Sequence, residues 1–370
     1  MIFIHRYVLF IFLFVFGYQA KAGLYPGETI MKGGGAESLV FFKKGDPNKP
    51  LIVFVPGDSH LARISYGYPQ GREKDFLSYW LNKEGYSFLG ISYPLENPVY
   101  TQVYPGFSIH DWGEQIAEIS QQIIAKHKLS NKIVILGWSM GGSIEETATR
   151  AAARHGLEVQ LFIGLSAVPP LPYVMQSGPY STSTMRANHL ADRSKLFPVF
   201  YQLIEQQNQL NQHKIIAETV YFSEFVGHIP AALSAEGYSY QNQHLVKNIP
   251  KTLKDGQVFD FANTPWIALI VDDSMTTAKI SLIDPAAWNF LRAEMIYSQY
   301  LTGKLSGASS QKWHEISEFL NSLPQLLTMT VNGNHFFFLG EKGAKNTAEH
   351  INSLLGRVES VKKKLNQLLQ

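Results

Sequence analysis

The stretch Lys132-Ile-Val-Ile-Leu-Gly-Trp-Ser-Met-Gly-Gly142 decides the fold. It begins with a run of apolar residues typical of a strand buried on both faces, and the residues from Met140 to His155 are predicted to form a helix. Between them lies a G-x-S-x-G pentapeptide, Gly137 to Gly141. A strand, this pentapeptide and a helix together predict a sharp turn with a strained serine backbone, in which bulkier residues than glycine would collide. The turn would project the Ser139 hydroxyl above the sheet and aim the Met140 N–H at the same point.

Strands and helices are predicted to alternate outward from this stretch. Such alternation indicates an α/β fold, with a mostly parallel sheet and helices on both faces. Gly33-Gly34-Gly35 is predicted to be a loose loop that leads into the first strand. Ser108 is predicted to be the N-cap of the helix over 111–127. The predicted strands are 38–42, 51–55, 86–93, 132–136, 159–165, 266–271 and 327–331; the predicted helices are 76–84, 111–127, 140–155, 201–218 and 344–368, with a further helical excursion over 285–323.

The alternation breaks between residues 168 and 263, where five prolines precede a helical stretch rich in Gln and Asn. Because this segment separates two predicted core strands, we interpret it as a helical or irregular cap insertion over the end of the sheet. It is rich in aromatic residues, which suit either a lid over an apolar acyl group or the insertion's own small core. The aromatic residues are Tyr173, Tyr180, Phe197, Phe200, Tyr201, Tyr221, Phe222, Phe225, Tyr238 and Tyr240.

With its turn at Ser139, the chain resembles the α/β-hydrolase superfamily over residues 36–370, apart from the insertion. The resemblance implies a serine nucleophile, followed along the chain by an acid and then a histidine. It also implies a second oxyanion donor after the strand that ends at Val55. Many members have His-Gly at that point, whereas this chain has Pro56-Gly57, and the backbone N–H after the glycine belongs to Asp58.

The acid of the implied triad follows the strand 266–271, where Asp272 and Asp273 are adjacent. The run Asp273-Ser-Met-Thr resembles the family's acid and its turn, so Asp273 is preferred and Asp272 is the alternative. Two adjacent side chains should point in different directions, so only one of them can meet the histidine. That histidine is His335, in a loop after the last predicted strand. His60 is close in sequence to Asp58, in the loop that would supply the second oxyanion donor, and would line the substrate pocket there.

These residues predict a serine hydrolase, most simply a lipase-like or esterase-like enzyme that cleaves a carboxylic ester through an acyl-enzyme. An amidase, peptidase or thioesterase on the same scaffold remains an alternative, as does a binding protein that has kept the fold without catalysis. The expected partner is a small or lipid-like acyl substrate. No cofactor or metal is expected, because the sequence contains no HExxH, Walker or dinucleotide-binding motif.

The amino-terminal residues predict the compartment in which the protein works. Arg6, ten uncharged residues from Tyr7 to Phe16, and Ala20-Lys21-Ala22 form the pattern of a signal peptide, residues 1–22. Only 14 residues between Arg6 and Lys21 lack charge, too few for the ~20 of a membrane span. The sequence therefore predicts an exported protein, periplasmic or secreted, with a hydrolase domain over 23–370. Its 370 residues include no cysteine, and a net charge of +2 gives no case for nucleic-acid binding.

Overall fold

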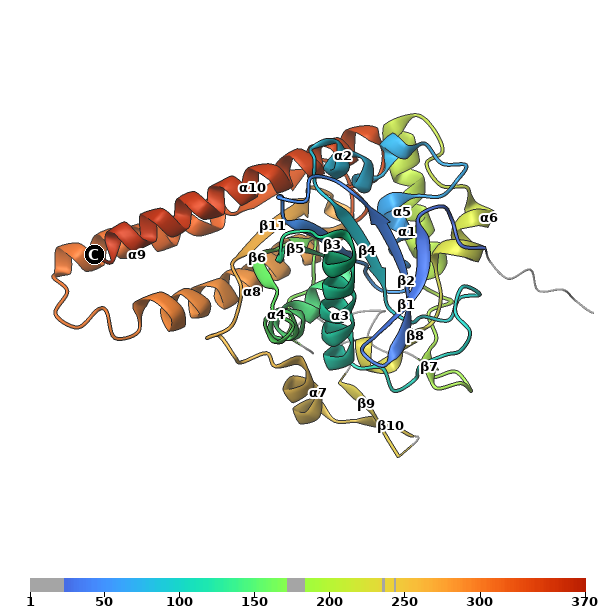
Figure 1. Ribbon diagram of the computed structural model, residues 1–370, viewed down its shortest axis with the longest axis horizontal. Helices are drawn as coiled ribbons and strands as arrows, with labels where there is room; N and C mark the ends of the chain where they lie inside the picture. The colour runs from blue at the N-terminus through green and yellow to red at the C-terminus, as the bar shows by residue number, and fades with distance from the viewer. Residues whose placement is uncertain (1–22, 172–183, 235–236, 243) are drawn as a thin grey trace, which may run out of the picture.

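A computed structural model describes residues 23–171, 184–234, 237–242 and 244–370. The predicted signal peptide lies outside these residues, as do Tyr173 and Tyr180 of the cap. The predicted α/β fold is confirmed by an eight-stranded sheet in the order β1-β2-β4-β3-β5-β6-β11-β12 (Figure 1). All neighbours from β4 to β12 pair in parallel, and only the β1–β2 and β2–β4 pairs are antiparallel. The strands are β1 Glu28–Gly33, β2 Ala36–Lys43, β3 Leu51–Val55, β4 Phe88–Ser92, β5 Lys132–Trp138, β6 Glu158–Leu165, β11 Ile267–Asp272 and β12 Thr328–Val331.

Helices cover both faces of the sheet, as predicted. The side chains of β3 point alternately to the two faces of the sheet. Ile52 and Phe54 belong to one buried hydrophobic cluster, and Leu51 and Val53 belong to the other. The first cluster contains side chains from helices α2 and α10, and the second contains side chains from α3, α4 and part of α8. The helices of the body are α1 Arg63–Tyr66, α2 Leu77–Lys83, α3 Ile109–His127, α4 Glu145–Arg154, α8 Ala278–Ile296, α9 Ser310–Leu326 and α10 Glu341–Leu368.

The amino-terminal edge of the sheet differs from the prediction. The three glycines were expected to form a loose loop, but β1 and β2 form an antiparallel hairpin in which Gly33 pairs with Ala36. Gly34 and Gly35 form its two-residue turn with φ angles of 56° and 75°, a backbone that suits glycine and the twist of a hairpin. The predicted Ser108 N-cap is confirmed, because its hydroxyl accepts from the Asp111 N–H and the Asp111 carboxylate accepts from the Ser108 N–H.

The segment between β6 and β11 leaves the sheet, because these two strands pair directly with each other. Its described residues form short strands and helices that lie beside the core sheet: β7 Leu190–Ala191, α5 Phe197–Asn211, α6 Glu218–Val220, β8 Ile229–Pro230, β9 Tyr238–Gln241, β10 His244–Lys247 and α7 Ile249–Gly256. Three of its aromatic side chains, Tyr201, Tyr221 and Phe225, are buried in the same cluster as Trp138 of β5. These side chains therefore join the cap to the main core.

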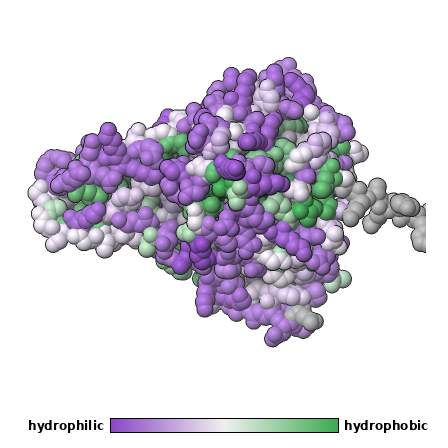
Figure 2. Space-filling view, viewed as in Figure 1, coloured by the Kyte–Doolittle hydropathy of each residue, from purple (hydrophilic) through white to green (hydrophobic). Residues whose placement is uncertain are grey.

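Helices α9 and α10 lie side by side and extend away from the sheet (Figure 1). The face in Figure 2 is mostly hydrophilic, and hydrophobic residues appear on it in separate areas. Among the described residues, no helix combines the length and the apolar character needed to cross a membrane.

Two buried carboxyl groups at the start of α4 give a testable dependence of stability on pH. Burial raises the pKa of Glu145 well above its ordinary value and that of Glu146 to about 8, while the Thr264 hydroxyl bonded to Glu146 opposes the shift. Between pH 4.5 and about 8 the folded protein then binds more protons than the unfolded chain, so its free energy of unfolding falls as pH rises. Each group contributes a slope of at most about 1.4 kcal/mol per pH unit.

Urea unfolding of the wild type and of the Glu145→Gln/Glu146→Gln variant, at pH 5 and pH 8, measures this effect. We expect the variant to lose less stability than the wild type between the two values of pH. An identical loss in both proteins would show that these carboxyl groups do not cause it.

Candidate active site

Ser139 lies in the turn that the sequence predicts. It follows β5 directly and begins a 3₁₀ turn, Ser139–Ile144, that leads into α4. Its φ of 53° is in the left-handed region, which costs a residue with a side chain of order 1–3 kcal/mol. Both flanking glycines are required by close contacts: a Cβ on Gly137 would lie 2.7 Å from the Gly141 carbonyl oxygen, and one on Gly141 would lie 2.6 Å from the Val55 oxygen.

The loop after β3 lies against this serine. A Cβ on Gly57 would be 2.6 Å from Ser139 Cβ and 3.2 Å from its hydroxyl oxygen. β3 and β5 are neighbours at the point where the strand order reverses, and open α/β sheets bind ligands beyond the carboxyl ends of such strands. The Gly57 carbonyl accepts from the buried Tyr93 hydroxyl at 2.9 Å. In the described part of the chain, the Asp58 N–H of the same peptide donates no hydrogen bond.

His335 lies in the loop between β12 and α10, and only 5% of it is exposed. The indole N–H of Trp138, the residue before Ser139, donates to the His335 carbonyl at 2.9 Å, and the two rings are 5.4 Å apart. Burial lowers the pKa of the imidazole to about 4, and the nearby Asp272 carboxylate opposes this shift. Its Nδ1 has no hydrogen-bond partner within the described residues. The structure thus brings the histidine loop to the turn that carries Ser139.

The two candidate acids, Asp273 and Asp272, have different surroundings in the structure. Asp272 is the last residue of β11, is 2% exposed, and is the carboxylate whose charge acts on His335. Asp273 is exposed and accepts instead from the Gly333 N–H at 3.0 Å and the Asn332 amide at 3.2 Å. It also lines an open hollow of about 440 Å³. The carboxylate whose charge acts on the imidazole is thus the buried one, and we carry Asp272 forward as the acid in the proposal below.

Three hydroxyl and amide groups hold the Asp272 carboxylate. Ser166, at the end of β6, donates to Oδ2 at 2.8 Å, and the Ser274 N–H donates to Oδ1 at 3.2 Å. The Thr277 hydroxyl also donates to Oδ1. Asp272 is therefore fixed beside the imidazole without a direct hydrogen bond to it, and catalytic hydrogen bonds are often loose before substrate binds.

Helix α5 of the cap holds the histidine loop through Asn334. The Asn334 amide donates to the Leu203 carbonyl at 2.8 Å and to Gln206 at 2.9 Å, and its oxygen accepts from Gln207 at 2.9 Å. The same oxygen accepts from the Phe336 N–H at 3.0 Å. The partners of Asn334 in α5 lie more than 120 residues away along the chain, so the residues around His335 alone do not reveal this role.

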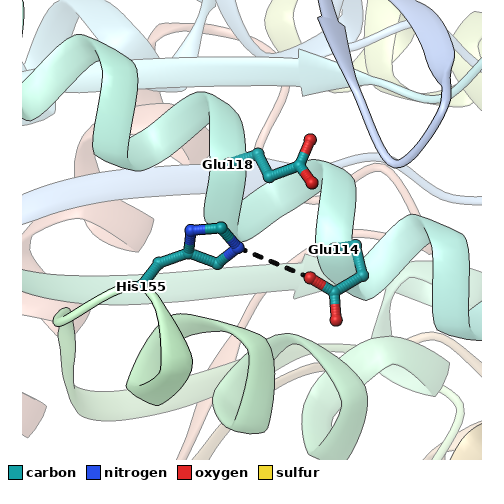
Figure 3. A group of neighbouring side chains, drawn as sticks. All are labelled: Glu114, Glu118 and His155. Atoms are coloured by element: carbon teal, nitrogen blue, oxygen red, sulfur yellow. Dashed lines mark ion pairs between the residues drawn. The ribbon is translucent and has the colours of Figure 1, made fainter.

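One group of side chains resembles a metal site, away from the residues above. Figure 3 shows Glu114 and Glu118 of α3 beside His155 at the end of α4, with ligand atoms within 4.8 Å of one another. Glu114 already pairs with Arg154, whose guanidinium supplies the positive charge, and with His155 at 3.5 Å. Glu118 accepts from the Gly34 N–H at 3.0 Å. We therefore interpret the group as a partly exposed ion-pair network.

Comparisons with known proteins support the fold. No protein-family model and no curated protein matches the sequence. Among solved structures, Cfl2 from Burkholderia cenocepacia matches with a TM-score of 0.51 and 10% identity over 89% of this chain and 95% of that chain. A thermophilic esterase from Thermogutta terrifontis matches with a TM-score of 0.44 and 12% identity, over 90% of this chain and 98% of that one.

A thioesterase domain from the curacin biosynthetic pathway matches with a TM-score of 0.43 and 12% identity, over 89% of this chain and 98% of that one. At such identities the likeness concerns the fold alone. The match to Cfl2, with the strand order and the helices on both faces of the sheet, supports the predicted α/β fold.

Proposed function

We propose that this protein is a serine hydrolase that cleaves carboxylic esters. The observation that carries the proposal is the left-handed Ser139, at the start of a helical turn, with Gly57 packed against it. His335 and Asp272 lie at the same edge of the sheet, in the chain order Ser, Asp, His that the α/β hydrolases use. Phe200 of the cap is only partly buried where it packs against Phe336 beside this edge, and such a side chain suits an apolar acyl group.

The proposed reaction has two steps. His335 takes the proton of Ser139 as the serine oxygen attacks the ester carbonyl carbon, and the Met140 and Asp58 N–H groups stabilise the oxyanion. His335 then gives the proton to the leaving alcohol, which leaves an acyl group on Ser139. Water, deprotonated by His335, attacks this acyl-enzyme and releases the acid. Asp272 orients the imidazole and stabilises its cation.

Activity against three substrates with a common acyl group tests the bond type. We expect turnover of p-nitrophenyl esters to exceed that of the matched thioester and of the matched aminoacyl anilide. Faster cleavage of the thioester or anilide would replace the proposed ester specificity with the corresponding alternative. Turnover of none of them by the folded protein would favour a binding protein that has kept the fold.

The pKa of His335 predicts the acid limb of the pH profile. The neutral imidazole is the base, so kcat/KM should fall as pH drops through about 4 rather than through the ordinary value of 6.5. Initial rates on an ester that is stable in acid, with circular dichroism to confirm folding at each pH, measure the midpoint. A midpoint at or above 6.5 would contradict the lowering of the His335 pKa by burial.

We also propose that residues 1–22 direct export and are removed. The pattern from Arg6 to Ala22 supports this, and the chain immediately after it is held in the fold, since the Gly23 carbonyl accepts from buried Arg63 at 3.2 Å. Removal takes away two basic residues and no acidic residue, which leaves 30 of each and a net charge of zero. Amino-terminal sequencing of the exported protein should begin near Gly23, and a sequence beginning at Met1 would refute cleavage.

A further inference from the structure

His60 is a second histidine beside the candidate active site, and the proposed mechanism does not use it. It lies in the loop after β3, three residues beyond Gly57, and none of its surface is exposed. Its ring packs 5.0 Å from that of Trp138, which precedes Ser139, and 5.5 Å from that of Phe336, which follows His335. A polar ring enclosed among aromatic side chains is costly unless both its nitrogen atoms are bonded.

Both ring nitrogens of His60 are bonded, and their partners fix its tautomer. Nδ1 is 2.6 Å from the Asp58 carbonyl oxygen, and Nε2 is 2.9 Å from the hydroxyl of Tyr221. Because a carbonyl oxygen only accepts, Nδ1 carries the hydrogen, and Nε2 accepts from the Tyr221 hydroxyl. Tyr221 belongs to the cap, so these bonds run from the cap through His60 to Asp58.

Asp58 is held at both of its peptide groups. The peptide before it is held by Tyr93, whose hydroxyl donates to the Gly57 carbonyl at 2.9 Å. The peptide after it is held by His60. The N–H of the first peptide is the proposed oxyanion donor, and its direction depends on the backbone angles of Asp58, which both contacts restrict. The next residue, Ser59, has a φ of 67°, a conformation that persists only when its surroundings enforce it.

The cap also binds this loop through its backbone. The Leu61 N–H donates to the Phe225 carbonyl at 2.8 Å, and the Gly227 N–H donates to the Ser59 carbonyl at 3.0 Å. The side chain of Asp58 pairs with Arg193 of the cap at 3.3 Å. The oxyanion loop is therefore fastened to the cap on both sides of His60.

The environment keeps His60 uncharged. Burial lowers its pKa to about 3, the Asp58 carbonyl opposes this shift, and a charge on nearby His335 lowers it further. A neutral His60 leaves the proton of the reaction to His335. It can therefore support the loop throughout the catalytic cycle without a change in its own hydrogen bonds.

We propose that His60 is a positioning residue which, bonded to Tyr221 of the cap, holds Asp58 so that its N–H faces the oxyanion formed at Ser139. This inference rests on the proposed serine hydrolase function and makes the cap a part of the catalytic scaffold. An oxyanion donor acts in the transition state more than in the bound substrate, so its misplacement lowers kcat and leaves KM nearly unchanged.

The test compares three tyrosine variants that each lose only a hydroxyl. Tyr221→Phe removes the bond to His60, and Tyr93→Phe removes the bond to the Gly57 carbonyl. Tyr201→Phe is the matched control, because Tyr201 packs 5.3 Å from Tyr221 but its hydroxyl points to the Ile216 carbonyl. We expect kcat on a p-nitrophenyl ester to fall about 10-fold to 100-fold in the first two variants and to change little in the control. This fall is no larger than the one caused by removing a whole oxyanion donor.

A second measurement separates positioning from general structural damage. A trifluoromethyl ketone forms an oxyanion on the serine, so its inhibition constant should rise by the same factor as kcat/KM falls. If Tyr221→Phe fails to fold, His60→Asn replaces it, since the asparagine amide can still donate to the Asp58 carbonyl but cannot reach Tyr221. An unchanged kcat, or a rise in KM alone, would overturn the inference. A wild type without esterase activity would refute the proposed function instead.

Discussion

Replacing Ser139 by alanine should lower kcat for ester hydrolysis by about 10³-fold or more while the protein stays folded. The reaction loses its nucleophile, whereas the contacts of Gly57, Gly137 and Gly141 that shape the turn remain. His335→Ala should cause a loss of similar size, because the base and the nucleophile act as one unit. Initial rates on one activated ester measure both variants.

The backbone of Ser139 adds a second expectation. At a φ of 53° a glycine is not strained, so Ser139→Gly should be as inactive as Ser139→Ala but more stable than the wild type by about 1 kcal/mol. Ser360→Ala, on the exposed face of α10, is the control for loss of a serine hydroxyl. Near-normal turnover in a folded Ser139→Ala protein would show that this serine is not the nucleophile.

Asp272→Asn should cost up to about 10⁴-fold in kcat, whereas Asp273→Asn should retain most of the activity. An asparagine keeps the shape of the acid but favours the wrong tautomer of the imidazole, which has an effect of that size in a serine protease. Asp273 bonds to the backbone and amide of the loop before His335, so its loss should mainly reduce stability, by about 1 kcal/mol.

The two variants form a matched pair, because the residues are adjacent and the substitution is the same. Both should be assayed on the same ester, with thermal unfolding measured in parallel. An inactive Asp273→Asn beside an active Asp272→Asn would show that the sequence preference was right and that the buried carboxylate has only a structural role. Full activity in both would place the acid elsewhere.

Sequence predicts the turn at Ser139 well because all of its determinants are local. The buried strand, both glycines and the helix start lie within Lys132–Gly142, and each is recognisable without knowledge of the rest of the chain. The choice between Asp272 and Asp273 is different. It depends on where β11 ends, and pairing of Asp272 with Val331 of β12 extends that strand one residue beyond the predicted end. A shift of one residue in a strand reverses which side chain points inward.

Other features depend on contacts between distant segments. The hairpin of β1 is supported by the buried pair of Glu28 with Arg63, at 2.8 Å, so its glycines alone did not reveal it. His60 and Tyr221 are 161 residues apart, and nothing near either of them indicates that they are bonded. The prolines and aromatic residues predict an insertion between residues 168 and 263, but they do not predict its contacts with the loop after β3 and with Asn334.

Labelling with a fluorophosphonate tests the central claim most directly. The reagent reacts with an activated serine through the same base and oxyanion donors as an ester. Peptide mapping by mass spectrometry should find one adduct per chain, on Ser139, and none in Ser139→Ala. The absence of any adduct on the folded wild type, or a single adduct on another serine, would contradict the assignment of Ser139 as the nucleophile.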